Sequence, residues 1–155
     1  MIPLFRKAMK YNGNAHIVFD GNSLFTGSPS VPDLAVASAP VSGSGTTSAN
    51  VAIAGQTWRM MNGQDGGSTA DVNGAFSASR QNVLVLWEHT NAICNVGRTA
   101  NQCYQDMLDY IAARRAVSPG CPILVLGTIP RQGFTLTAAY SNVKQINAAL
   151  QQVDL

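Results

Sequence analysis

The chain has 155 residues, a length typical of one domain with its own hydrophobic core. Charged residues make up only 12% of it, Glu88 is the only glutamate, and the formal net charge is +2. Because Lys and Arg are scattered and form no basic stripe, nucleic acid is not expected as a partner. No stretch has the pattern of a signal peptide or a membrane span, so we expect a soluble protein, whose location the sequence leaves open.

The first half of the chain predicts two strands, each followed by a glycine-containing turn. The apolar run 16–19 ends at Gly21-Asn22, and the run 50–54 ends at Gly55. Residues 25–49 lie between them and are rich in Ser, Gly, Pro and Thr, which fits either a surface linker or a loop beside an active site. The glycine-rich stretch 60–74 has no phosphate-binding spacing, and we interpret it as turns.

The second half predicts two longer strands, each followed by a helix. The runs 82–87 and 122–129 are continuously apolar, as in parallel strands covered on both faces. A helix capped by Thr99 and stopped by Pro119-Gly120 presents one apolar stripe, formed by Ala100, Cys103, Tyr104, Met107, Leu108 and Ile111. A second helix from about Thr137 presents Ala139, Val143, Ile146, Leu150 and Val153.

Strands alternating with helices predict an α/β fold with a parallel sheet, in a single domain over 1–155. The three cysteines contain no CxxC pair, which argues against a zinc site. We expect free thiols, with one Cys94–Cys103 bridge as the alternative.

Ser23 lies on the first turn after the first predicted strand, at the edge of a parallel sheet where α/β proteins bind ligands. The position suits a nucleophile, and it also suits a helix N-cap, the commonest use of serine after a strand. Asp20 lies one position before this turn, and we expect it to make local turn hydrogen bonds.

Four blocks of the sequence lie along or after successive predicted strands: residues 21–24, 50–57, 86–91, and 128–131 with Asn147. Together they resemble the SGNH hydrolases, also called the GDSL-like esterase family. Gly21-Asn22-Ser23-Leu24 is similar to the GDSL block, and Asn50-Val-Ala-Ile-Ala-Gly55-Gln-Thr57 is similar to the second block. Leu86-Trp-Glu-His-Thr-Asn91 is similar to the third, usually Gly-x-Asn-Asp, and Thr128-Ile-Pro-Arg131 with Asn147 resembles the family's next segment and helix. The resemblance implies a flavodoxin-like three-layer sandwich with a central parallel sheet, the SGNH hydrolase fold.

The resemblance also implies the chemistry. Ser23 would be the catalytic nucleophile, and the oxyanion hole would be formed by the backbone amides of Ser23 and Gly55 and the side chain of Asn91. Glycine lets its amide approach a substrate closely, and asparagine offers two N–H donors without charge. Such donors supply a large part of the catalysis of acyl transfer. No metal and no cofactor are expected.

The chain departs from the family pattern at Asn22 in place of Asp, at His89 in place of Gly and at Ala92 in place of Asp. It also lacks the family's late Asp-x-x-His segment, which supplies the acid and the base. We expect truncation at the C-terminus, with the last strand and helix missing, and a missing C-terminal segment or a partner chain completing the site. His89 lies two residues before Asn91 and is either a substitute base or a structural histidine. His89 and Asn22 are both candidates for accessory residues of the site.

The sequence is therefore compatible with two functions. The first is a serine hydrolase, an esterase or carbohydrate O-deacetylase, that acts on a small ester or an acylated carbohydrate. The second is a non-catalytic carbohydrate-binding or structural module on the same scaffold, such as part of a phage tail or a cell-surface protein. The low charge and the loops rich in Gly, Ser and Thr suggest a phage or bacterial origin.

Overall fold

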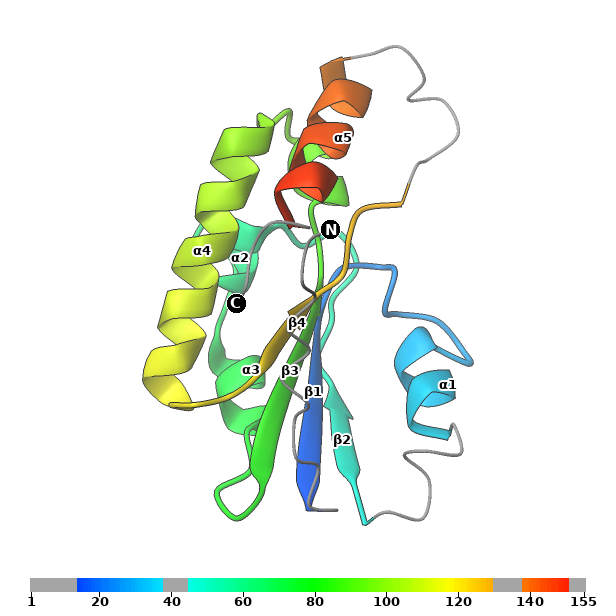
Figure 1. Ribbon diagram of the computed structural model, residues 1–155, viewed down its shortest axis with the longest axis vertical. Helices are drawn as coiled ribbons and strands as arrows, with labels where there is room; N and C mark the ends of the chain where they lie inside the picture. Colours follow the sequence, from blue (N-terminus) through cyan, green and yellow to red (C-terminus); the bar gives the residue numbers. More distant parts are fainter. Residues whose placement is uncertain (1–13, 38–44, 130–137, 151–155) are drawn as a thin grey trace, which may run out of the picture.

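A computed structural model describes residues 14–37, 45–129 and 138–150, without the side chains of residues 138 and 140 (Figure 1). Four parallel strands form one sheet in the order β2-β1-β3-β4. They are β1 (Ala15–Gly21), β2 (Thr47–Asn50), β3 (Gln81–Trp87) and β4 (Ile123–Val125). The helices are α1 (Val31–Ala37), α2 (Trp58–Met61), α3 (Ala70–Ala75), the π-helical turn η1 (Asn91–Asn95), α4 (Ala100–Val117) and α5 (Ala138–Leu150).

Helices flank the sheet on both sides. Figure 1 shows α2, α3 and α4 on one side and α1 on the other. This arrangement confirms the predicted α/β fold with a central parallel sheet. From β1 the chain continues to β2 on one side of this strand and then crosses to β3 and β4 on the other side. The direction in which successive strands are added therefore reverses between β1 and β3. Ligands of open α/β sheets bind outside the carboxyl ends of the strands at such a point.

The strand predictions were accurate in the centre of the sheet and less accurate at its edges. β1 and β3 include the predicted runs, whereas β4 is shorter than the predicted 122–129. The strand predicted at 50–54 was placed too late in the chain, because β2 ends at Asn50, where the apolar run begins. β2 is an edge strand with largely exposed residues, so it needs no apolar run.

The long helix α4 follows its prediction closely. Thr99 caps it through a capping box, in which Thr99 Oγ1 accepts from the Gln102 N–H at 3.3 Å and Gln102 Oε1 accepts from the Thr99 N–H at 3.0 Å. The helix ends at Val117, just before Pro119-Gly120. Its inner face packs against α2, β1, β3 and α5 in one hydrophobic core. The fully buried residues of this core include Val18, Trp58, Met61, Leu84, Leu86, Met107, Tyr110 and Ile146.

Three short helices lie in the stretches that we interpreted as loops or turns. α1 begins after Ser30, whose Oγ accepts from the Asp33 N–H at 3.1 Å, while Asp33 Oδ2 accepts from the Ser30 N–H at 2.9 Å. α2 begins after Thr57, whose side chain accepts from the Met60 N–H at 3.3 Å. α3 spans only six residues. Helices of this length show no apolar period, so only their capping residues could have indicated them.

The second predicted helix is present as α5, and its predicted last residues, 151–153, lie outside the described part. Asn147 on α5 holds the chain after β4, since its side chain accepts from the Thr128 N–H and donates to the Thr128 carbonyl, both at 2.8 Å. All three cysteines are free thiols, so the alternative of a Cys94–Cys103 bridge was wrong.

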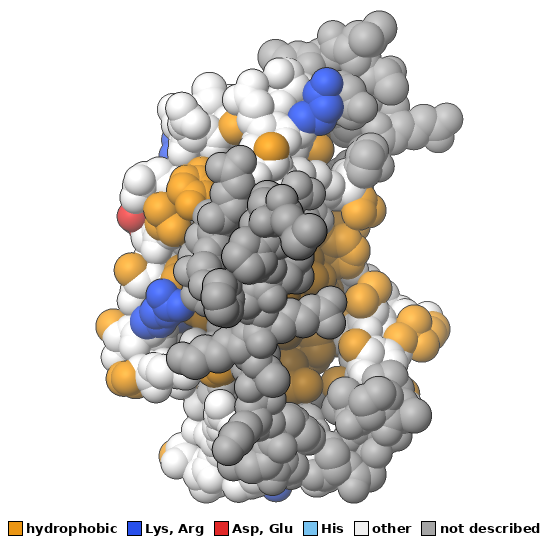
Figure 2. All heavy atoms as spheres, viewed as in Figure 1, with side chains coloured by type: hydrophobic (Ala, Val, Ile, Leu, Met, Phe, Trp, Pro, Cys, Tyr) orange, Lys and Arg blue, Asp and Glu red, His pale blue; other side chains and the backbone are white. Residues whose placement is uncertain are grey.

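Charged side chains are few and separate from one another on the face shown in Figure 2, as the composition predicts. Among the described helices, none is long and apolar enough to cross a membrane.

Candidate active site at the carboxyl edge of the sheet

The carboxyl ends of β1 and β3 are bound tightly together at the point where the strand order reverses. The Asn22 N–H donates to the Trp87 carbonyl at 3.2 Å, at the end of the paired register. A Cβ at Gly21 would overlap the backbone of Trp87, so only glycine allows this close approach. The glycine of the Gly-Asn-Ser-Leu block therefore fixes where the following serine emerges.

Ser23 is exposed on the turn that follows β1. The turn is closed by the Phe25 N–H, which donates to the Asn22 carbonyl at 3.0 Å, and by the Thr26 N–H, which donates to the Ser23 carbonyl at 3.3 Å. Asn22 is buried and accepts from the Leu24 N–H through Oδ1 at 2.9 Å. Within the described residues, the Ser23 N–H has no acceptor and remains available to a ligand.

Gly55 lies on the segment that follows β2. This segment extends the sheet beyond the regular strand, since the N–H groups of Val51 and Ile53 donate to the carbonyls of Phe19 and Gly21 at 2.9 and 3.1 Å. Gly55 is exposed and has a φ of +87°, a conformation that favours glycine. Its N–H, like that of Ser23, has no acceptor in the described part of the chain.

Asn91 follows β3 and is held on both sides of its amide. Its Nδ2 donates to the Gln56 carbonyl at 2.9 Å, and its Oδ1 accepts from Asn95 Nδ2 at 2.9 Å. The first bond joins the loop after β3 to the segment that carries Gly55. One hydrogen of the Asn91 amide is used in this bond, and the second is left for another acceptor.

Glu88 organises the loop after β3 from inside the protein. Its Oε1 accepts from the N–H groups of Asn91 and Ala92 at 2.9 and 3.1 Å. Burial raises the pKa of this carboxyl to about 8. The backbone amides of Ala92, Asn91 and Trp58 and the side chain of Asn22 lower the pKa, but by less than burial raises it. At neutral pH Glu88 is therefore mainly protonated and uncharged.

The three comparisons with known proteins differ in outcome. No protein-family model matches the sequence, and no curated protein matches it. Among solved structures, the chain is similar to a member of the lipolytic protein G-D-S-L family from Veillonella parvula DSM 2008, with a TM-score of 0.65 and 14% identity over 89% of this chain and 71% of that one. It is also similar to a protein described as a GDSL-like lipase from Parabacteroides merdae ATCC 43184, with a TM-score of 0.66 and 13% identity over 90% and 72%.

The chain has the α/β fold of these GDSL-type structures. At these identities the likeness concerns the fold, and the sheet order and flanking helices are the features that carry it. In this GDSL-type fold, Ser23, Gly55 and Asn91 each follow one of three neighbouring strands at the same edge of the sheet.

His89 occupies the position where the resemblance to the SGNH hydrolases implies glycine, and its backbone has the conformation that glycine favours, with a φ of +91°. Its side chain is fully buried, and Nδ1 accepts from Trp58 Nε1 at 3.0 Å. Burial lowers the pKa of His89 to about 3, so the ring is neutral. These contacts favour the structural histidine over the substitute base.

The other histidine lies at the opposite end of the sheet from Ser23. His16 is at the beginning of β1, where its ring nitrogens bond to Thr47 Oγ1 at 2.7 Å and to the Ala75 carbonyl at 2.8 Å. It therefore cannot reach the Ser23 hydroxyl.

The sequence analysis missed two buried groups behind the site. Glu88 stands within the third block, and as the only glutamate directly after a buried strand it could have been noticed. The second is Asp20: the expectation of local turn bonds was correct for Oδ1, which accepts from the Gly21 N–H at 2.8 Å, and incomplete for Oδ2, which accepts from the Tyr110 hydroxyl on α4. The two residues are 90 positions apart, so sequence spacing gave no sign of this bond.

Proposed function

We propose that this chain carries the nucleophile and the oxyanion donors of a serine hydrolase that cleaves carboxylic esters. The observation that carries the proposal is the convergence of three segments at one sheet edge, where the amides of Ser23 and Gly55 are free among the described residues and Asn91 has a spare N–H. The GDSL-type fold of lipolytic structural neighbours supports the same reaction class.

In the proposed reaction, Ser23 Oγ attacks the carbonyl carbon of the ester while a base takes the hydroxyl proton. The negative charge that develops on the carbonyl oxygen is stabilised by the Ser23 and Gly55 amides and by Asn91 Nδ2. The alcohol leaves with a proton, and water then hydrolyses the acyl group from Ser23. A small ester or an acylated carbohydrate is the proposed substrate class, which includes deacetylation.

The reaction needs a base that neither histidine of the chain supplies. His16 is at the wrong end of the sheet, and His89 is buried with Nδ1 bonded to Trp58. We therefore assign the base to a further chain segment or to a partner chain. The same observation favours the second candidate function, a non-catalytic module that binds an acylated carbohydrate at this edge.

The test supplies the base from solution. The chain is treated with a fluorophosphonate probe and imidazole, and the modified residue is located by mass spectrometry. Wild type and the control Ser28→Ala, which changes another exposed serine nearby, should be labelled, whereas Ser23→Ala should not. Equal labelling of the Ser23 variant contradicts the mechanism, and an unlabelled wild type that still binds an acetylated oligosaccharide supports the non-catalytic module.

The oxyanion donors are tested separately. Removal of one such donor commonly lowers the rate by about 10²–10³-fold. Asn91→Ala should slow the labelling of Ser23 to that degree, while Asn95→Ala, which removes only the partner of Asn91 Oδ1, should have a small effect. Similar labelling rates in both variants would exclude Asn91 as a donor.

A further inference from the structure

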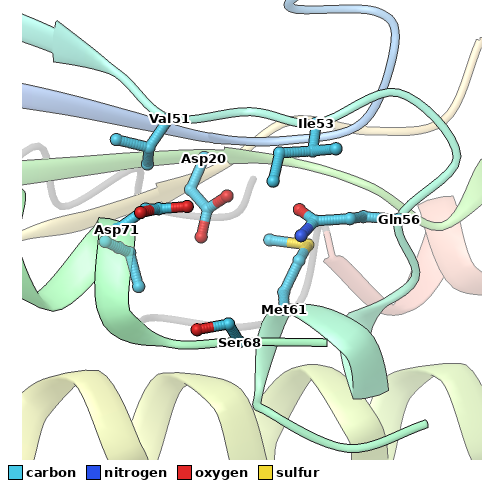
Figure 3. Close-up of a pocket in the computed structure, with 8 residues that line it drawn as sticks. Asp20, Val51, Ile53, Gln56, Met61, Ser68 and Asp71 are labelled. Carbon is cyan, nitrogen blue, oxygen red and sulfur yellow. The ribbon is translucent and has the colours of Figure 1, made fainter. Parts of the chain in front are cut away.

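A small polar cavity lies beside the sheet, and none of the residues proposed for ester cleavage lines it (Figure 3). Its volume is about 10 Å³, enough for one water molecule or one ion. It is bounded by the end of β1, the segment after β2, the end of α2 and the beginning of α3. The lining residues are Asp20, Val51, Ile53, Gln56, Met61, Ser68, Asp71 and Val72.

Four of these side chains bring oxygen atoms to the cavity, and Figure 3 shows them around one space. Asp20 is almost fully buried, while Asp71 and Ser68 are at the exposed side. Asp20 already accepts from the Gly21 N–H and the Tyr110 hydroxyl, and each of its oxygens retains a second lone pair. Ser68 Oγ accepts from the Ala70 N–H at 3.1 Å and likewise keeps a free lone pair.

The amide of Gln56 gives an independent sign of a missing occupant. Gln56 is 7% exposed, and its Oε1 is a buried atom without a hydrogen-bond partner. Figure 3 shows the end of this side chain directed into the cavity. A buried acceptor without a donor destabilises the folded state, and a donor or a cation in the cavity would remove that cost.

The charges around the cavity favour a cation. Asp20 and Asp71 both line the cavity, where their carboxylates repel each other. The guanidinium of Arg114 acts on Asp20 in the opposite direction, but Arg114 packs over the Tyr110 ring and is not among the residues that line the cavity. The space that Asp20, Asp71 and two neutral oxygens share therefore has acceptors and negative charge without a facing cation among the described residues.

We propose that this cavity is a binding site for one Ca²⁺ ion, held by Asp20, Asp71, Gln56 Oε1 and Ser68 Oγ. Oxygen-only donors suit a hard cation, and Ca²⁺ accepts irregular sets of carboxylate, amide and water oxygens. Water completes the shell from the adjoining open hollow of about 520 Å³, which shares Val51, Ile53 and Asp71 with the cavity. This proposal differs from the expectation from the sequence that no metal is bound. The site has only two acidic ligands, and no group of three or more His, Cys, Asp or Glu residues that could hold a metal ion occurs among the described residues.

Terbium luminescence tests the site directly, because Tb³⁺ replaces Ca²⁺ and is excited by nearby aromatic rings. Tyr110 donates to the proposed ligand Asp20, and its ring centroid is 5.7 Å from that of Trp58, so bound Tb³⁺ should emit on excitation of these rings. Addition of Ca²⁺ should quench the emission, and Mg²⁺ should do so only at higher concentration.

The matched variants are Asp71→Asn, which removes a partly solvated ligand, and Asp109→Asn, which changes a carboxylate on α4 that does not line the cavity. Calorimetric titration with Ca²⁺ should show binding to wild type and to the Asp109 variant, and binding weakened by roughly 10–100-fold or more in the Asp71 variant. Circular dichroism checks that each variant is folded. Equal affinity in the Asp71 and Asp109 variants, or a folded wild type that binds neither ion at millimolar concentration, would overturn the proposal and leave a water molecule as the occupant.

Discussion

Two buried carboxyl groups lie behind the candidate active site at the ends of neighbouring strands, and their ionisation differs. Asp20 is near the end of β1, and Glu88 is the first residue after β3. Burial is the largest cause that raises the pKa of both, to about 6 for Asp20 and to about 8 for Glu88. At neutral pH, Asp20 is therefore mainly ionised, and Glu88 is mainly protonated.

The difference arises from the partners of each group. Asp20 accepts from the Tyr110 hydroxyl and is near the positive charge of Arg114, both of which favour the ionised form. The groups that lower the pKa of Glu88 are all uncharged: the backbone amides of Ala92, Asn91 and Trp58 and the side chain of Asn22. Burial alone does not decide whether a carboxyl carries charge, because a nearby cation or hydroxyl can offset it. The charged group faces a polar cavity, and the uncharged one closes a loop.

The largest expected effect concerns the loop that Glu88 closes. Glu88→Ala leaves the N–H groups of Asn91 and Ala92 buried without an acceptor, and should lower the free energy of unfolding by about 2–5 kcal/mol. Glu88→Gln keeps the acceptor and the volume, and should cost less than about 1 kcal/mol, since the native group is already uncharged. Urea unfolding measures both. An equal loss in the two variants would mean that the negative charge itself stabilises the loop.

The next effect concerns the partner of Asp20. Tyr110→Phe removes the hydroxyl that donates to an ionised carboxylate, and hydrogen bonds to charged groups contribute about 1.5–3 kcal/mol. Tyr104→Phe on the same helix is the matched control, because Tyr104 is half-buried and belongs to the edge of the core. Urea unfolding at neutral pH should separate the two variants. If both lose the same stability, the bond to Asp20 contributes nothing to the fold.

Much of the fold could be predicted because its central elements have regular apolar patterns. β1, β3 and α4 are buried along one face or both, and burial leaves a period in the sequence. β2 could not be placed correctly, since an edge strand with exposed residues has no such period. The short helices α1, α2 and α3 depend on caps and on tertiary contacts.

The candidate site was predictable only in outline. The end of a buried strand indicates where Ser23 emerges, and the same argument applies to Asn91. The bond from Asn91 to the Gln56 carbonyl and the position of His89 against Trp58 depend on side chains that are distant in sequence. No local pattern encodes them.

The pH dependence of stability separates the two carboxyls further. Between about pH 6.5, the ordinary pKa of histidine, and about pH 8, Glu88 is protonated in the folded state and ionised in the unfolded one. The folded state then binds more protons, so stability falls as pH rises, by up to about 1.4 kcal/mol per pH unit and about 1–2 kcal/mol over the window. Urea unfolding of Glu88→Gln should show a flatter profile.

Below about pH 6.5, Asp20 and His89 act in addition to Glu88, whose effect on stability begins at its ordinary pKa of about 4.5. Asp20, with its raised pKa, reduces stability as pH rises from about 3.8 to 6. His89, whose pKa is lowered to about 3, increases stability up to about pH 6.5. It offsets the effect of Asp20 up to about pH 6, so the fall due to Glu88 remains there, and it offsets Glu88 only between about pH 6 and 6.5. An equal fall above pH 6.5 in wild type and in the Glu88 variant would mean that another group causes it.

The smallest expected effect tests why the chain has Asn22 where the resemblance implies Asp. The Asn22 amide is close enough to the Glu88 carboxyl to lower its pKa, although Asn22 Nδ2 and Glu88 Oε2 form no regular hydrogen bond in the described part of the chain. Asn22→Asp would place two carboxyls in one buried space, where they would share a proton and raise the pKa of Glu88 further. In a double-mutant cycle with Glu88→Gln, measured by urea unfolding at about pH 8, we expect an unfavourable coupling of about 1 kcal/mol. Additive effects would show that the two side chains do not interact, and the asparagine would then need another explanation than the carboxyl behind it.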